Sequence, residues 1–276
     1  MIKILTLGSL IITSWCFGQS LDKIGKLSSE LTEISGLCPF NNDLFICHND
    51  GGNKPILYFI DLKGAIVHQV AVENAKNVDW EDLTNDHKGN LYLADIGNNS
   101  NCRKDLCIYK ISSDSLLLKN SVKAQKIEFT YEDQLDFPPK KNALYFDAEA
   151  LGFYNDTLFI FTKCRTDPYD GKSNCYFLLP IAEKQIARKQ QTLQLKKRKM
   201  RKDAITSCCF DNNRCYLLSY SSIEIFNRID SQFIFEKSLP FYHWTQKEAL
   251  ALKENVLYLA DERIKFLGGK LYQIKF

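Results

Sequence analysis

Five positions with oxygen-bearing side chains recur in similar short segments of this 276-residue chain. Each is the third residue of a segment such as Asp-Trp-Glu-Asp-Leu, and the five are Ser35, Glu81, Glu149, Thr206 and Glu248. Three carboxylates brought close together repel one another and raise each other's pKa unless a cation lies among them. Carboxylate and hydroxyl oxygens suit a hard cation such as calcium. We therefore predict a calcium-like metal site; the alternative is that these side chains hydrogen-bond to neighbouring backbone and to water.

The segments that carry these residues each open a repeated unit. A second hydrophobic run follows after a turn rich in asparagine and aspartate, so each unit begins with a predicted β-hairpin. Two more strand-like runs follow in the first four units, for example Ile56 to Asp61 and Ala65 to Val72, and later Val122 to Tyr131. Four antiparallel strands repeated along a chain are typical of propeller blades. The units begin near residues 33, 79, 147, 204 and 246.

The last unit is one strand short of four. The segment Ile24 to Leu31 is strand-like and precedes the first hairpin without a unit of its own. If it pairs with the last unit, no open edge remains in the ring. We predict an all-β fold: a single five-bladed β-propeller over residues 19–276, closed by pairing of the N-terminal strand with the last blade. The alternative is an unclosed sandwich with accidental periodicity.

The start of the chain predicts export. Lys3 is followed by the apolar run Ile4 to Ile12 and by a small residue, Gly18, before Gln19, which is typical of a signal peptide over residues 1–18. We expect a periplasmic or secreted protein, and Cys16 leaves a lipoprotein as the alternative. No later segment approaches the roughly 20 apolar residues needed to span a bilayer.

The charge and the cysteines bear on partners and on redox state. A net charge of +3 is too small to predict a polyanionic partner, so nucleic acid is not expected. We expect a monomer that binds a small molecule or a component of the cell envelope. Exported cysteines encounter an oxidising compartment. Local spacing predicts two disulfides, Cys102 with Cys107 and Cys164 with Cys175.

A second group of polar residues lies mainly where the second strand of each hairpin ends. That end of the hairpin is also where the first strand begins, so these residues share one end of the propeller with the residues two before four of the recurrent positions, which are Glu33, Asp79, Asp147 and Gln246. The group comprises His48, Asp50, Asp95, Asn98, Asn99, Arg103, Lys163, Arg165, Asp261 and Arg263. A concave surface with a few convergent polar groups is typical of ligand sites. We predict a ligand-binding mouth; for each residue the alternative is a turn cap or a salt bridge between blades.

Several of these motifs together resemble a known family. They are His48-Asn-Asp, Asn77-Val-Asp-Trp-Glu-Asp-Leu83, Asp95-Ile-Gly-Asn-Asn99, Arg103, Phe146-Asp-Ala-Glu-Ala-Leu151 and Phe161-Thr-Lys163. The set is similar to a widespread group of secreted bacterial propellers without assigned activity, over roughly the first two thirds of the exported chain.

A more distant resemblance concerns the five recurrent positions. The segment Glu33-Ile-Ser35-Gly-Leu37 and the order serine, glutamate, glutamate, hydroxyl, glutamate resemble the calcium-activated apyrases, which are five-bladed propellers with a central calcium ion. This resemblance implies calcium at the ring, with Thr206 in place of a serine. The aspartate-rich N-terminal segment that apyrases use in nucleotide hydrolysis has no counterpart in Gln19 to Ser29.

Two classes of function are therefore predicted. One is a ligand-binding or scaffold module of the cell envelope with a central calcium-like ion and a polar mouth. The other is a calcium-dependent hydrolase of phosphoesters or nucleotides that uses the acidic and basic groups of the mouth.

Overall fold

The computed structural model describes residues 20–86, 88–114, 116–196, 198–242 and 245–275, so the predicted signal peptide lies outside it. Most of the regular secondary structure of the described residues is β-strand. The helical segments in these residues are η1 (Leu116–Leu118), η2 (Lys141–Ala143) and α1 (Met200–Asp203). No helix among them is long and apolar enough to cross a membrane.

The strands form antiparallel units of four, as the hydrophobic pattern predicts, and a parallel strand pairing joins the second and third units in one eight-stranded sheet. The first unit contains β2 (Ile34–Pro39), β3 (Leu44–Asn49), β4 (Ile56–Asp61) and β5 (Ile66–Val72). The second contains β6 (Trp80–Asn85), β7 (Asn90–Asp95), β8 (Cys107–Ser112) and β10 (Gln125–Tyr131). The third contains β11 (Asp147–Tyr154), β12 (Thr157–Lys163), β13 (Lys172–Leu178) and β14 (Gln185–Gln194). The fourth contains β15 (Ile205–Asp211), β16 (Arg214–Ser219), β17 (Ser222–Ile229) and β18 (Gln232–Pro240).

The last unit takes its fourth strand from the N-terminal part of the chain. It contains β19 (Lys247–Lys253), β20 (Val256–Asp261), β23 (Lys270–Lys275) and β1 (Asp22–Lys26), which pairs antiparallel with β23. The predicted pairing is confirmed, but the strand ends earlier than expected. Beyond β1, the Leu27 N–H still donates to the carbonyl of Gly269 at 2.9 Å, whereas the Ser28 N–H donates to the carbonyl of Gly64 in the first unit at 3.1 Å. A short hairpin, β21 (Arg263–Ile264) and β22 (Leu267–Gly268), interrupts the link from β20 to β23.

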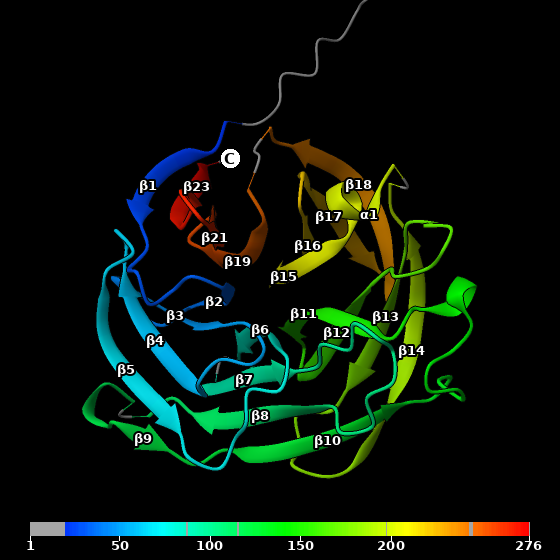
Figure 1. The fold of residues 1–276 in the computed structure, drawn as a ribbon, viewed down its shortest axis with the longest axis horizontal. Coiled ribbons are helices and arrows are strands. Elements are labelled where there is room, and N and C mark those ends of the chain that lie inside the picture. Colours follow the sequence, from blue (N-terminus) through cyan, green and yellow to red (C-terminus); the bar gives the residue numbers. More distant parts are fainter. Residues whose placement is uncertain (1–19, 87, 115, 197, 243–244, 276) are drawn as a thin grey trace, which may run out of the picture.

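The first strands of the units lie around a common axis (Figure 1). β2 contacts β6, β6 contacts β11, β11 contacts β15, β15 contacts β19, and β19 contacts β2. We call these the innermost strands. We call the end at which they begin, and at which the second strands of the units end, the mouth.

The passage from the first unit to the second corrects one predicted strand. The run from Val122 to Tyr131 is split in two. β9 (Ser121–Val122) pairs in parallel with β5 of the first unit, and β10 then joins the second unit. Between β9 and β10, where the chain passes from the first unit to the second, the Asn74 side chain forms two hydrogen bonds with the backbone of Ala124, of 2.9 and 2.8 Å.

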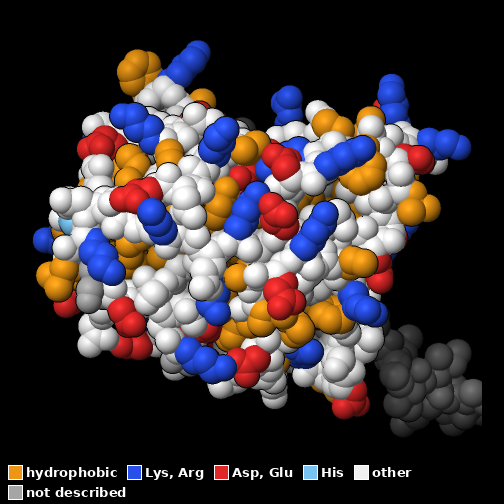
Figure 2. Space-filling model, turned by 90° about the horizontal axis from the view of Figure 1, so that it is seen from below, with side chains coloured by type: hydrophobic (Ala, Val, Ile, Leu, Met, Phe, Trp, Pro, Cys, Tyr) orange, Lys and Arg blue, Asp and Glu red, His pale blue; other side chains and the backbone are white. Residues whose placement is uncertain are grey.

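Hydrophobic side chains fill the space between neighbouring units. Between the third and fourth units, for example, Phe159 and Phe161 pack edge-on against Phe233, with ring centroids 5.7 and 5.6 Å apart. Full burial of such a side chain contributes about 1.5–3 kcal/mol. On the face seen in Figure 2, basic and acidic side chains are interspersed.

Each innermost strand has a β-bulge at a corresponding place. The residue left out of the pairing register is Glu81 in β6, Glu149 in β11, Thr206 in β15 and Glu248 in β19. In β2 it is Gly36, with φ of 66°, the residue after the recurrent position Ser35. A bulge breaks strict alternation and re-aims side chains. Four recurrent positions therefore coincide with the bulges, and the first is displaced by one residue.

The predicted disulfides are not formed. The nine cysteines of the described chain are all free. Cys107 is buried in the core beside β6, whereas Cys102 is exposed. Cys175 is buried between the third and fourth units, while the Cys164 thiol lies 3.1 Å from the Thr166 hydroxyl. Sequence spacing misled here because it does not indicate which way each side chain faces.

Candidate functional site

Three carboxylates converge at the mouth. Asp50 follows β3, Asp79 precedes β6, and Glu81 is the bulge residue of β6. One carboxylate oxygen from each lies within 4.8 Å of the others. Asn77 holds the two loops together, because its amide donates to the carbonyls of Asn49 and Asp50 at 3.0 and 2.8 Å. We call Asp50, Asp79 and Glu81 the acidic trio.

Two glycines allow backbone to approach the acidic trio closely. A Cβ on Gly51 would lie 2.3 Å from an Asp79 carboxylate oxygen. A Cβ on Gly97 would lie 2.2 Å from a Glu81 carboxylate oxygen. Any larger residue at either position would collide with the carboxylates, so these glycines shape the site.

Burial and mutual repulsion raise the pKa of all three carboxyls. The pKa of Asp79 rises to about 6, first through burial and then through the charges of Asp50 and Asp147. Burial, followed by the charge of Glu149, raises the pKa of Glu81 well above its ordinary value. Burial also raises the pKa of Asp50. A cation beside these groups would favour their ionised form.

Lys163 lies among the other two acids of the predicted ring. Its ammonium is 2.9 Å from a Glu149 carboxylate oxygen and 3.0 Å from the Tyr220 hydroxyl, and its side chain is only 8% exposed. Burial alone would lower the pKa of Lys163, but the charges of Glu149 and Glu248 raise it well above its ordinary value. The protein therefore supplies its own cation to this half of the ring.

Arg165 extends the positive charge toward the outside. Its guanidinium donates to Asp147 and Asn99 and lies 3.3 Å from a Glu149 oxygen. A cavity of about 390 Å³ opens beside it and is lined by Lys163, Arg165, Met200, Arg201, Tyr220, Thr245 and Gln246. This basic cleft has the charge to receive an anionic group.

Known proteins resemble the chain in structure and not in sequence. No protein-family model matches it, and no curated protein matches its sequence. The PQQ-bound aldose sugar dehydrogenase of Streptomyces coelicolor is similar, with a TM-score of 0.53, 9% identity and coverage of 92% of this chain and 97% of that one. The glutaminyl cyclase of Myxococcus xanthus gives 0.53 at 12% identity, over 94% and 95% of the two chains. A luciferin-regenerating enzyme gives 0.50 at 11% identity, over 94% and 92%.

The fold is a β-propeller. Identities this low establish the shared fold and carry no activity from these enzymes to this propeller.

The two hydroxyls predicted as ring ligands are engaged elsewhere in the propeller. The Ser35 hydroxyl donates to the carbonyl of Glu81, and the Thr206 hydroxyl donates to the carbonyl of Lys247 at 2.7 Å. For these two residues the geometry matches the hydrogen-bonded alternative. Among the described residues, Glu81 is the recurrent position that belongs to the acidic trio.

Several predicted mouth residues support the acidic trio without belonging to it. Arg103 pairs with Asp95 at 2.9 Å, and Asp95 also accepts from the Asp79 N–H at 3.1 Å. Asn98 accepts from the Arg103 N–H at 2.9 Å. His48 is fully buried edge-on against a tryptophan, and burial lowers its pKa to about 4. A neutral, buried imidazole of this kind packs inside the propeller and does not face the open mouth.

Asp261 and Arg263 connect segments of the chain at the mouth end of the last unit. Asp261 is completely buried, 3.0 Å from the Lys247 ammonium and 2.9 Å from the Tyr272 hydroxyl. Arg263 donates to the carbonyl of Leu27 at 2.7 Å and so fastens the N-terminal segment. Both residues match the alternative of structural ties.

Asp82 is a buried group of the axis that sequence reasoning missed. Its carboxylate accepts from the Leu151 N–H at 3.0 Å, the Cys208 N–H at 3.2 Å and the Ser207 hydroxyl at 3.1 Å. β6 and β15 are separated by β11 around the ring, so this side chain reaches across the axis. Asp82 therefore connects three innermost strands of the propeller.

Proposed function

We propose that this chain is an exported five-bladed propeller that binds a small anionic ligand at its mouth with the help of a calcium-like cation. The observation that carries the proposal is the acidic trio. Its carboxylates lie within 4.8 Å of one another. Within the described chain, the neighbouring acids Asp147 and Glu149 form ion pairs with Arg165 and Lys163, whereas the trio forms no ion pair.

Each innermost strand contacts the next, and the last contacts the first, which supports a count of five blades. In this reading each four-stranded unit is one blade, and β21 and β22 are an insertion in the last blade. The pairing of β1 with β23 is the closure.

The donor set of the trio favours a hard cation. Carboxylate oxygens are preferred ligands of calcium, which takes 6–8 oxygens and so leaves positions for water and for a bound ligand. In this proposal Asp50 and Asp79 join Glu81 as protein ligands. Glu149 and Glu248, which lie beside Lys163, are not ligands.

The basic cleft supports an anionic ligand. Lys163 and Arg165 line the cleft and also contact Glu149, whose charge raises the pKa of Glu81. A phosphate or carboxylate group held between the cation and these side chains would meet opposite charge on both sides. We place this ligand-binding or scaffold module in the cell envelope.

Calcium titration of matched variants tests the proposal. Isothermal calorimetry should give one calcium per chain, and Asp79→Asn and Glu81→Gln should each weaken binding at least about tenfold because a charged ligand is lost. Glu149→Gln should bind calcium nearly as well as the parent protein. Glu128→Gln, an exposed carboxylate paired with Lys126 on outer strands, is the control. Loss of binding in Glu149→Gln but not in Asp79→Asn would instead support the ring of five.

A calcium-dependent hydrolase is the second candidate. The juxtaposition of the acidic trio and the basic cleft favours it, because cation and arginine together stabilise charge that develops on a phosphoryl group. Phosphate release from a panel of nucleotides and phosphoesters, with calcium and with chelator, discriminates the two. Calcium-dependent release that Glu81→Gln abolishes would establish the hydrolase. Binding without release would leave the ligand-binding module.

A further inference from the structure

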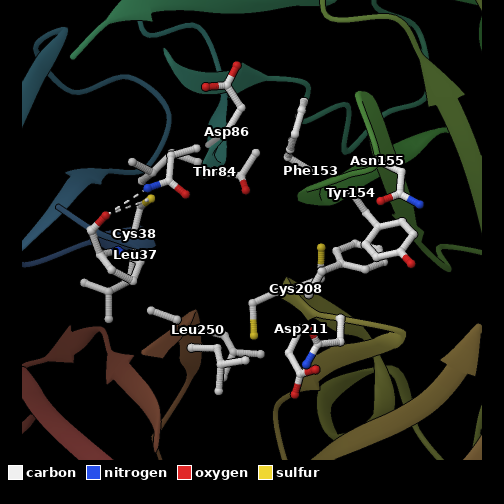
Figure 3. Close-up of a pocket in the computed structure, with 18 of the residues that line it drawn as sticks. Leu37, Cys38, Thr84, Asp86, Phe153, Tyr154, Asn155, Cys208, Asp211 and Leu250 are labelled. Atoms are coloured by element: carbon white, nitrogen blue, oxygen red, sulfur yellow. Dashed lines mark hydrogen bonds between the residues drawn. The ribbon is translucent and has the colours of Figure 1, made fainter. Parts of the chain in front are cut away.

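A second cavity lies at the opposite end of the axis from the mouth. It has a volume of about 630 Å³, and all five innermost strands contribute to it (Figure 3). The turns that follow these strands form its rim. We call it the turn-side cavity. Its size falls within the roughly 300–1,000 Å³ that is typical of small-molecule sites.

Asp82 and Ser207 separate this cavity from the mouth. The N–H groups of Leu83 and Cys208, two residues that line the cavity, donate to the Asp82 carboxylate at 2.9 and 3.2 Å. The N–H of Leu250, which also lines it, donates to the Ser207 hydroxyl at 3.2 Å. The floor of the cavity is therefore fixed by hydrogen bonds, and a ligand there is independent of the acidic trio.

The walls of the turn-side cavity are apolar and partly aromatic. Phe153, Tyr154 and Phe210 lie along one side, with the last two rings stacked at a centroid distance of 5.6 Å and an angle of 26°. A Cβ on Gly152 would lie 2.3 Å from the Phe210 ring, so glycine is required for this packing. Leu37 and Leu250 lie across the cavity (Figure 3). These surfaces favour a flat aromatic ligand.

The rim of the cavity is acidic. Three of its lining residues are carboxylates, Asp86, Asp156 and Asp211, against one cation, Lys88. Lys88 already pairs with Asp156 at 2.6 Å. The remaining negative charge favours cations and disfavours anions. We propose that the turn-side cavity binds a small aromatic molecule that carries a protonated amine.

Three naphthalene probes of matched shape test this proposal. Calorimetry in chelator should show saturable 1:1 binding of 2-naphthylmethylamine, weaker binding of 2-naphthylmethanol, and at least about tenfold weaker binding of 2-naphthoate, because the acidic rim repels it. Asp211→Asn should reduce the preference for amine over carboxylate about threefold.

Two tryptophan variants locate the binding. Thr84 lines the cavity, so Thr84→Trp should fill it and abolish binding of the amine. Thr130→Trp, on the exposed side of β10, should leave binding unchanged. The proposal is overturned if no probe saturates, if 2-naphthoate binds as tightly as the amine, or if Thr84→Trp binds like the parent. Glu81→Gln should bind the amine normally, which separates this result from failure of the calcium proposal.

Discussion

At the scale of single residues, the mouth contains two kinds of acid. Glu149 and Asp147 form ion pairs with Lys163 and Arg165. Asp79 has no such partner in the described chain, and its pKa rises to about 6 because burial and neighbouring acids disfavour its charge. A carboxyl of this kind destabilises the fold when it is ionised without a cation.

Asp79 should therefore make stability depend on pH in the absence of calcium. Its pKa is raised in the folded state, to about 6, so the folded state holds the proton more tightly than the unfolded chain. Stability should fall as pH rises from about 4 to about 6. At pH 7.5 in chelator, Asp79→Asn should be about 1–2 kcal/mol more stable than the parent by urea unfolding, and near parity at pH 4. If Asp79→Asn and the parent protein were equally stable at both pH values, ionisation of Asp79 would not destabilise the fold.

At the scale of strands, the bulges explain why the recurrent positions could be found but not fully interpreted. Hydrophobic alternation and turn residues predict the hairpins because both are local properties of the chain. The bulge also lies at the recurrent position in each innermost strand except β2. In β2 the bulge residue is Gly36, one residue later, and Gly36 adopts the left-handed conformation. Two adjacent acids, Glu81 and Asp82, interrupt the alternation of polar and apolar residues along the strand. That interruption could have been used to predict a second buried acid.

The partners of the site residues could not be predicted in the same way. Lys163 reaches Glu149 from the next strand, and Arg165 reaches Asn99 from another unit. Which side chain fills the space beside an acid depends on packing between units, and no spacing along the chain encodes it. The same reason explains why the two disulfide predictions are wrong, since Cys107 is buried in the core whereas Cys102 is exposed.

Asp82 should stabilise the fold because it connects three innermost strands by hydrogen bonds. Asp82→Ala would leave the Leu151 and Cys208 N–H groups and the Ser207 hydroxyl without their acceptor. Each unsatisfied buried group costs about 1–3 kcal/mol, so the loss of stability should be at least about 3 kcal/mol. Asp82→Asn keeps one acceptor oxygen and should lose less. Urea unfolding measures the free energy of unfolding of both variants. An Asp82→Ala protein as stable as the parent would contradict a stabilising role of these hydrogen bonds.

At the scale of the whole molecule, closure depends on β1. Its pairing with β23 joins Asp22 to Gln273 across nearly the full described chain. Leu27 and Leu271 pack in the same cluster between the last and first units, so the pairing also covers apolar surface.

Removal of residues 20–26 should open the ring. The edge of β23 would then be unpaired, and apolar surface near Leu271 would be exposed. We expect an aggregated or molten product, seen as loss of a cooperative melting transition and increased dye binding. Removal of the β21–β22 tip, residues 264–267, is the control and should leave the transition in place. Cooperative melting of the first truncation at the parent temperature would mean that the ring closes elsewhere.

The same pairing has a consequence for how the molecule is made. β1 leaves the ribosome before the other described strands, yet its partner Lys270–Lys275 is the last of them to be synthesised. The four units built from consecutive strands contain mostly local contacts and can form as they emerge. The closing contact joins the most distant strands, which is the slowest kind to form. A circularly permuted chain that begins at β2 and carries β1 after β23 would make that contact local, and should fold faster to the same ring.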